Sequence, residues 1–337
     1  HLHSSQQNIV AVCQKGSQIS KLIKSPLVGI TKTNIMNIFY RAYQLSSYIK
    51  KENIRIIHVS WTKDLLLSAL VKLFSGNKIS IIYHRQMKIT RYKKDIYHNF
   101  IYKSINIVLV ITKALSEDCK KFLPIDNDRI IKLSYGIALP DNKNTFDKKL
   151  LFDEIELQEN IFTIGVFSRI EEQKGQHLII EALNILHEKN IQLLIVGHCM
   201  DISYQNDLRK MIEKYNMHDR VAFKPFIESP MKIMPMLDLI ILPTYEETFG
   251  LVVAESMLMG TPVIGSNAGG VPEIINDNNN GLLFESRNSK SLSKKIISIY
   301  ESEELRIKLS NNAKIFASEE YNYEKHFSKL TTILQKL

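Results

Sequence analysis

Residues 239–265 read LIILPTYEETFGLVVAESMLMGTPVIG and contain a strand, a helix and a second strand in succession. The apolar run Leu239–Leu242 ends at Pro243 and has the length of a buried strand. A polar turn follows, a helix is expected to open at about Thr248–Leu251, and Pro262–Gly265 is the next expected strand. Such a unit is the building block of a parallel sheet.

The same alternation of short β-branched runs and longer amphipathic segments extends along the whole chain. It predicts an α/β protein with doubly wound parallel sheets, because each crossover between parallel strands needs a helix. The expected strands of the first half are Asn8–Cys13, Ile54–Val59, Ile79–His84, Ile105–Ile111 and Ile130–Leu133. Those of the second half are Ile161–Phe167, Gln192–Val196, Val221–Phe226, Leu239–Leu242, Pro262–Gly265 and Leu282–Phe284.

The length of 337 residues favours two domains, since single cores rarely grow past about 250 residues. The polar stretch Asp141–Asn160 interrupts the alternation and is the expected linker. We therefore expect a Rossmann-like domain over 1–145, a second over 146–320, and a C-terminal helix over 321–337 that packs back on the first. The strand carboxyl ends of the two domains would face a central cleft.

Composition indicates an ordinary globular protein, with 45% hydrophobic and 23% charged residues. No apolar run approaches the ~18 residues of a membrane span, and the chain begins at His1 without a basic and apolar leader. The three cysteines, Cys13, Cys119 and Cys199, are too widely spaced to predict a disulfide framework or a zinc site. A cytoplasmic location is expected.

Charge is distributed unevenly between the halves. Residues 1–150 contain 25 Lys and Arg against 9 Asp and Glu, whereas residues 151–337 contain 19 against 26. The basic half predicts a solvated surface or attraction to an anionic acceptor or membrane, where each cation contributes ~1 kcal/mol. Nucleic acid is not expected, because no zinc pairs or RNA-binding aromatic signature accompany the cations. The densest cations are Arg85, Lys88, Arg91, Lys93 and Lys94.

Two cations follow the expected strand Ile161–Phe167. Ser168 and Arg169 come directly after it, and Lys174 precedes the expected helix Gln176–Lys189. Helix starts present unpaired N–H groups, Arg grips phosphate bidentately and Lys acts as a point charge, so this place suits phosphate. A solvated loop is the alternative.

Two carboxylates flank the helix start in the opening stretch. Glu247 lies just before the helix and Glu255 about two turns inside it, on an apolar segment where a charge needs a partner. Carboxylates hold hydroxyl-rich ligands, and the N–H groups of residues 248–252 would meet an anion. The alternative makes Glu247 a helix cap and Glu255 a paired surface residue.

Together these residues resemble the retaining GT-B glycosyltransferases, also called group 1 glycosyl transferases, of the Glu-x7-Glu type. The resemblance covers about half of the chain. Its motifs, in order, are Gly165–Arg169 with Lys174-Gly175, Val196-Gly197, Pro243–Glu255, Gly260–Val263, Gly269–Glu273 and Gly281–Leu283.

The resemblance implies that Arg169 and Lys174 bind the donor diphosphate, Glu247 the donor sugar and Glu255 the nucleotide ribose. It also implies retention of the anomeric configuration, no metal and no cofactor beyond the nucleotide sugar. Further donor contacts are implied at Ser168, Gly197, Phe226, Thr248, Phe249, Gly250, Leu251 and Val252.

Two departures concern the nucleotide base. Lys224-Pro225-Phe226 stands where the family usually has a glycine, and His198 follows Gly197 where a second glycine is common. The choice between a UDP and a GDP donor therefore stays open.

The acceptor half matches the family less closely. His84 resembles a strand-end histidine at the reaction centre and is assigned to catalysis with Glu247, Arg169 and Lys174; a neutral structural histidine is the alternative. Tyr135 replaces the Asn of an Asn-Gly loop. The family begins with a strand and a glycine-rich loop, and we expect the chain to lack both. The assigned acceptor-side residues are Arg85, Lys88, Arg91 and Tyr135.

The expected function is transfer of a sugar from a nucleotide-diphosphate sugar to a glycan or glycolipid, such as lipopolysaccharide or capsule, by a protein bound peripherally at the inner face of the membrane. The alternatives are a sugar-nucleotide epimerase, a phosphorylase, or a nucleotide-sugar-binding protein without turnover. A phosphorylase would need a lysine for its pyridoxal cofactor, and none is identified.

Overall fold

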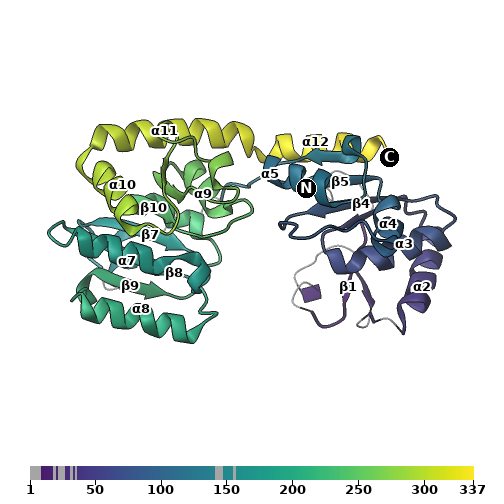
Figure 1. Ribbon diagram of the computed structural model, residues 1–337, viewed down its shortest axis with the longest axis horizontal. Coiled ribbons are helices and arrows are strands. Elements are labelled where there is room, and N and C mark those ends of the chain that lie inside the picture. Colours follow the sequence, from purple (N-terminus) through teal and green to yellow (C-terminus); the bar gives the residue numbers. More distant parts are fainter. Residues whose placement is uncertain are drawn as a thin grey trace. The chain divides into compact units, whose positions relative to one another are not determined.

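The computed structural model describes residues 9–17, 20–21, 27–30, 33–34, 36–140, 147–154 and 157–337, with the side chain of residue 151 excepted. The chain divides into two compact units (Figure 1). One contains His1–Gly136 and Tyr323–Leu337, and the other contains Ile137–Asn322. The domain boundary expected at residues 145 and 146 lies outside the described residues.

The first unit has two parallel sheets. One pairs β1 (Ala11–Gln14) with β2 (Leu27–Ile30), and the other has four strands in sequence order. In its register, Val59 lies beside Tyr83 and His84 beside Leu109. The four strands are β3 (Ile56–Val59), β4 (Ser80–Arg85), β5 (Ile107–Val110) and β6 (Ile130–Lys132).

Helices bury the apolar faces of these strands. Leu45 of α2 and Leu70 of α3 belong to one hydrophobic cluster with Ile79. Leu330 of α12 belongs to a second cluster with Ile82 and Leu109. The C-terminal helix therefore completes the core of the first unit. The helices are α2 (Ile38–Lys51), α3 (Leu65–Phe74), α4 (Ile96–Lys103), α5 (Lys113–Phe122) and α12 (Tyr323–Gln335).

The second unit is one six-stranded parallel sheet in the order β12-β11-β10-β7-β8-β9. Its strands are β7 (Phe162–Phe167), β8 (Ile191–Val196), β9 (Val221–Lys224), β10 (Leu239–Leu242), β11 (Val263–Ser266) and β12 (Leu282–Phe284). Its helices are α6 (Lys148–Glu154), α7 (Gln176–Ile185), α8 (Ile202–Lys214), α9 (Leu251–Met259), α10 (Ser289–Glu301) and α11 (Glu303–Glu320).

Strand order in this sheet reverses between β7 and β10. From β7 the chain moves to β8 and β9 on one side, and from β10 it moves to β11 and β12 on the other. Right-handed crossovers then place α7 and α8 on one face, where α10 joins them, and α9 with α11 on the opposite face. The loops after β7 and β10 diverge at this switch point, which is where such sheets bind ligands.

The α/β class with parallel sheets is confirmed, and each of the eleven predicted strands overlaps a strand of the structure. The strand Leu27–Ile30 was not predicted, because Gly29 interrupts a run of only four residues. Within the expected linker lies the helix Lys148–Glu154, which is too short to show a clear amphipathic period in the sequence.

Candidate active site

The switch point brings together the two loops that the sequence singled out. Ile240 lies beside Gly165 in the ladder, so Ser168 after β7 and Pro243 after β10 stand at the same level. The first loop carries the short 3-10 helix Glu172–Lys174 and turns into α7. Main-chain N–H of Tyr245 donates to the Gln173 carbonyl at 3.0 Å, which ties the second loop to the first.

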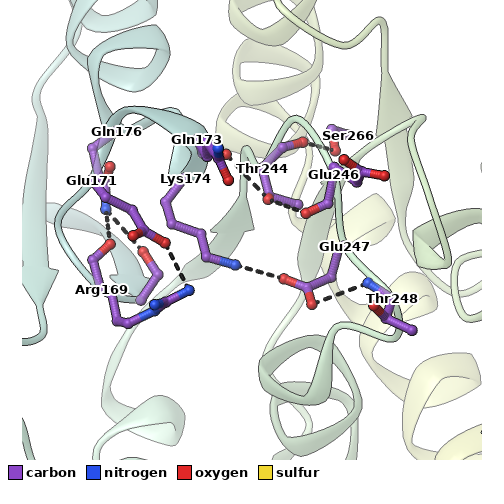
Figure 2. Close-up of polar contacts among 11 residues, drawn as sticks. Arg169, Glu171, Gln173, Lys174, Gln176, Thr244, Glu246, Glu247, Thr248 and Ser266 are labelled. Atoms are coloured by element: carbon purple, nitrogen blue, oxygen red, sulfur yellow. Dashed lines mark hydrogen bonds and ion pairs between the residues drawn. The ribbon is translucent and has the colours of Figure 1, made fainter. Parts of the chain in front are cut away.

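An ion pair crosses between these loops. Lys174 Nζ lies 2.9 Å from Glu247 Oε2, although 73 residues separate them in the chain (Figure 2). The other carboxylate oxygen accepts the main-chain N–H of Thr248 at 3.2 Å. The Lys174 and Glu247 side chains are 16% and 23% exposed, so water and ligands reach both. A cation and a carboxylate therefore stand side by side at the switch point.

Arg169 occupies the same loop in a more open position. Its side chain is 57% exposed, and its guanidinium contacts Glu171 at 2.8 Å. The loop beneath is fixed by the buried Gln176, whose Nε2 donates to Ser168 Oγ at 2.9 Å and to the Arg169 carbonyl at 2.7 Å (Figure 2). The main chain of the loop is thus held in place, while the guanidinium is largely exposed and paired with Glu171.

A third loop supports Glu247 from its main chain. The N–H of Gly270 donates to the Glu247 carbonyl at 2.7 Å. Gly269 has a φ of +58°, and a Cβ there would lie 2.1 Å from the same carbonyl oxygen. Only glycine fits this close approach. The Gly-Gly pair therefore positions the carboxylate without itself presenting a side chain.

The N-terminus of α9 lies next to Glu247. Gly250 is its N-cap residue, has a φ of +95° and provides no side-chain cap. The first N–H groups of a helix have no acceptor within the helix, so those of Leu251 and Val252 suit an anion. Phe249 is buried against Tyr321, with 5.5 Å between ring centroids, and anchors the turn.

Glu255 lies one turn inside α9 and is half-buried. No described residue forms a hydrogen bond or ion pair with its carboxylate. Burial raises the pKa of Glu255 to about 7. A half-buried carboxylate without a hydrogen-bond partner is unfavourable for folding. Its presence therefore suggests a ligand whose hydrogen-bond donors pair with it.

The loops after β8 and β9 present aromatic surface. The rings of His198 and Phe226 stack with 4.9 Å between centroids and 12° between planes, and Phe226 is exposed. Gly197 packs closely against the loop after β7: a Cβ at this position would lie 1.9 Å from the Ser168 carbonyl oxygen. Gly197 thus allows the two loops to touch, and the stacked pair presents a flat, partly exposed aromatic surface.

The first unit holds His84 at the end of β4. It is 9% exposed, and its Nε2 has no hydrogen-bond partner in the described part of the chain. Its ring stacks on His58 at 5.7 Å and lies 6.5 Å from Tyr135. Burial, followed by the neighbouring His58 and His326, lowers the pKa of His84 to about 4. The imidazole is therefore neutral near pH 7.

The cations that the sequence assigned to the acceptor side differ in how they are placed. Arg85 Nη1 donates to Thr62 Oγ1 at 2.7 Å and to the Tyr83 hydroxyl at 2.8 Å, while Nη2 donates to the Lys88 carbonyl at 2.7 Å. Arg85 thus braces the loop after β4. Lys88 and Arg91 have exposed side chains.

The family model for glycosyl transferases group 1 matches residues 147–316, which is half of the chain. The chain belongs to this family. All the donor-side residues named above lie within the matched region. In the described part of this glycosyltransferase, no helix is long and apolar enough to cross a membrane.

Solved structures share the fold of this glycosyltransferase. A glycosyltransferase from Rickettsia africae ESF-5 matches with a TM-score of 0.90 at 21% identity, covering 99% of this chain and 91% of that one. Anabaena Alr3699/HepE in complex with UDP-glucose matches with a TM-score of 0.83 at 19% identity, covering 97% and 92%. These likenesses place the fold in the GT-B class.

Sequence similarity also extends to a curated relative. The N-acetyl-alpha-D-glucosaminyl L-malate synthase of Bacillus anthracis is 25% identical over 301 residues, which cover 87% of this glycosyltransferase and 77% of that enzyme. The similarity extends well beyond the region of the family model, so it includes part of the first unit.

Sequence reasoning missed the residues that support the donor loops. Gln176 and His177 directly follow Lys174-Gly175, and their place at a helix start was the available signal. Tyr245 lies within the quoted motif but received no role. Gln176 contacts Arg169, 7 residues away, His177 contacts Tyr204, 27 residues away, and Tyr245 contacts His177, 68 residues away. The pattern along the chain does not indicate such contacts.

Glu255→Gln is expected to stabilise the glycosyltransferase above neutral pH. Because the folded pKa is raised above the ordinary value of 4.5, the native state binds more protons, and stability falls as pH rises from about 4.5 to 7. The gain at pH 8 should be about 1–2 kcal/mol, since water still reaches a half-buried group, and should disappear near pH 4. Urea unfolding at both pH values measures it.

The exposed Glu213→Gln on α8 is the matched control and should show no such pH dependence. Equal stability of Glu255→Gln and the parent at pH 8 would contradict the assignment of a destabilising carboxylate.

Proposed function

We propose that this glycosyltransferase moves a sugar from a nucleotide-diphosphate sugar to an acceptor hydroxyl with retention of the anomeric configuration. The observation that carries the proposal is the Lys174–Glu247 pair at the switch point, with Arg169 on the same loop. The UDP-glucose complex of the structural neighbour supports a nucleotide-sugar donor. Donor sugar and nucleotide, UDP or GDP, are left to experiment.

On this proposal Arg169 and Lys174 bind the donor diphosphate, and the α9 N–H groups add to the same site. As the bond between the anomeric carbon and the phosphate oxygen breaks, its electron pair goes to the diphosphate. The two cations offset that growing charge, and preorganised groups of this kind contribute about 2.7–4 kcal/mol each in other enzymes. The acceptor oxygen attacks the same face and gives its proton to the departing diphosphate, so no metal or further cofactor is required.

Glu247 is proposed to accept hydrogen bonds from hydroxyl groups of the donor sugar, and Glu255 from the ribose. Glu255 has the stronger physical support, because its half-buried carboxylate has no partner among the described residues. The stacked His198 and Phe226 are proposed to carry the base.

His84 is proposed to contact the reaction centre. Its buried, neutral imidazole presents a partnerless Nε2 in the described chain, and such an atom is costly unless a ligand hydroxyl pairs with it. Arg85, Lys88, Arg91 and Tyr135 are proposed to serve the acceptor side.

The acceptor is proposed to be a lipid-linked or cell-envelope glycan, reached at the inner face of a membrane. The cation excess of residues 1–150 supports this. The segment from Arg91 to Phe100 also exposes large apolar side chains beside its cations, including Ile96, which is 91% exposed. The cations Arg91, Lys93 and Lys94 lie on the loop before α4, and Ile96 is the first residue of that helix, so a basic loop adjoins exposed apolar side chains, as at membrane-binding surfaces.

Binding to anionic vesicles is expected and should weaken as salt is raised, because screening reduces the attraction of surface cations. Replacing Arg91, Lys93 and Lys94 with glutamate should reduce binding about 100-fold or more, since each cation contributes ~1 kcal/mol. Replacing Ile96 with glutamate should reduce it about 10-fold. Ile315→Glu in the second unit, also an exposed isoleucine, is the control. Flotation with phosphatidylserine and phosphatidylcholine vesicles measures this, and equal binding to both would refute it.

The test of the reaction is a panel of UDP- and GDP-sugars offered with glycan and glycolipid acceptors, with products identified by mass spectrometry. Transfer of one sugar residue supports the proposal. Conversion of the nucleotide sugar without an acceptor would favour an epimerase, and binding without any product would favour a binding protein.

A further inference from the structure

A chain of four side chains runs beneath the donor loops. Tyr204 comes from α8, His177 from the first turn of α7, Tyr245 from the β10–α9 loop, and Arg287 from the turn between β12 and α10. His177 Nδ1 lies 2.8 Å from the Tyr204 hydroxyl, and its Nε2 lies 2.7 Å from the Tyr245 hydroxyl. The Arg287 guanidinium covers the Tyr245 ring at 4.3 Å.

The hydrogen bonds suit a neutral imidazole. The main-chain N–H of His177 donates to the Tyr204 hydroxyl at 3.1 Å, so that hydroxyl can give its own proton to Nδ1. In that tautomer Nε2 carries the ring proton and donates a hydrogen bond to the Tyr245 hydroxyl; in the other, Nδ1 donates to Tyr204 and Nε2 accepts from Tyr245. Burial lowers the pKa of His177, outweighing the opposite effect of the nearby Glu181 and Glu172. Both ring nitrogens are therefore satisfied, and the ring orientation is fixed.

This chain joins the two loops of the candidate site. His177 is three residues after Lys174, and Tyr245 is two residues before Glu247. Besides the Lys174–Glu247 ion pair, the side-chain links between the loops include Tyr245 to His177 and Thr244 Oγ1 to the Gln173 carbonyl at 3.3 Å. The Tyr245 bond is the shorter of these two and is anchored at both ends, by Tyr204 and by Arg287.

A bound nucleotide sugar would compete with the ion pair. The diphosphate draws Lys174, and the sugar hydroxyls draw Glu247, so each gives up part of its interaction with the other. The spacing of the loops must then be held by contacts that the ligand does not touch. His177 and Tyr245 make such a contact, since their polar atoms are already paired with each other and with Tyr204.

We propose that His177 and Tyr245 are positioning residues that hold the diphosphate loop and the sugar loop at the spacing that a nucleotide sugar requires. The inference rests on the proposed function. It predicts that losing the contact weakens binding of a nucleotide sugar, which also engages Glu247, more than binding of the nucleotide alone. UDP and UDP-glucose, or GDP and GDP-glucose, are such a pair.

Tyr245→Phe removes one hydroxyl and keeps the ring under Arg287. We expect the ratio of the two dissociation constants, nucleotide sugar over nucleotide, to rise about 3- to 10-fold, the effect of one hydrogen bond in a partly buried site. His177→Phe should give the same change, and the double variant no more than either single one, because both remove one interaction. His177→Gln, which reaches toward Tyr245, should restore part of the ratio.

The experiment is calorimetry of each variant with the nucleotide that the parent chain binds and with its glucose derivative, alongside melting temperatures. Tyr300→Phe on α10 is the matched control, since its ring packs against Phe162 at the start of β7, the end of that strand away from the two loops. An unchanged ratio for Tyr245→Phe, with or without a lower melting temperature, would overturn the inference. Absence of nucleotide binding by the parent would overturn the proposed function and this inference with it.

Discussion

Replacing Glu247 with alanine is expected to reduce sugar transfer by about 10³-fold or more, an effect typical of groups that act on the transition state. The carboxylate is assigned to hydroxyl groups of the donor sugar and stands 2.9 Å from Lys174. The fold should survive, because Glu247 lies on a loop and its carboxylate contacts only Lys174 and the main-chain N–H of the adjacent Thr248. Steady-state transfer rates and thermal unfolding of the same preparation measure both effects.

Glu246→Ala is the matched control. Glu246 is the preceding residue of the same loop, has an exposed side chain, and differs in pointing away from Lys174 (Figure 2). Its loss should leave transfer within about 3-fold of the parent, as for most surface substitutions. Turnover of Glu247→Ala close to that of the parent would refute the assignment of Glu247 to the sugar.

Lys174→Ala is the second large effect and should lower kcat about 10²–10³-fold, equivalent to 2.7–4 kcal/mol of lost transition-state stabilisation. The reason is that charge on the diphosphate grows as the glycosidic bond breaks, so a fixed cation helps more in the transition state than in the ground state. Lys174→Arg should recover part of the rate, because the charge is kept but its position changes.

The exposed Lys294→Ala on α10 controls for loss of one surface charge and should leave kcat unchanged. A rise in KM with unchanged kcat for Lys174→Ala would show that the lysine binds substrate and transition state equally. That outcome would contradict its proposed role in leaving-group stabilisation.

Much of the fold was predictable because parallel strands and their crossover helices leave periodic signals along the chain. Leu239–Leu242 was predicted with its observed bounds, whereas Leu27–Ile30 was missed because a glycine divides it. The order of the strands was not predictable. Nothing in the pattern says that β10 pairs with β7, yet that pairing creates the switch point.

The candidate site was also predictable only in part. Arg169, Lys174 and Glu247 were recognised one by one from residue type and position, but their assembly depends on sheet order. The contact of Lys174 with Glu247 spans 73 residues, and that of Tyr245 with His177 spans 68. Local periodicity does not encode such pairs, so the supporting network became visible only in the folded chain.

Isothermal titration calorimetry of the chain with UDP and with GDP measures whether the second unit holds a nucleotide-sugar site at the β7–β10 switch point. We expect one of the two nucleotides to bind, and its binding to weaken in Lys174→Ala. Binding of neither nucleotide, by a preparation that includes any residues preceding His1 in the natural protein, would contradict it.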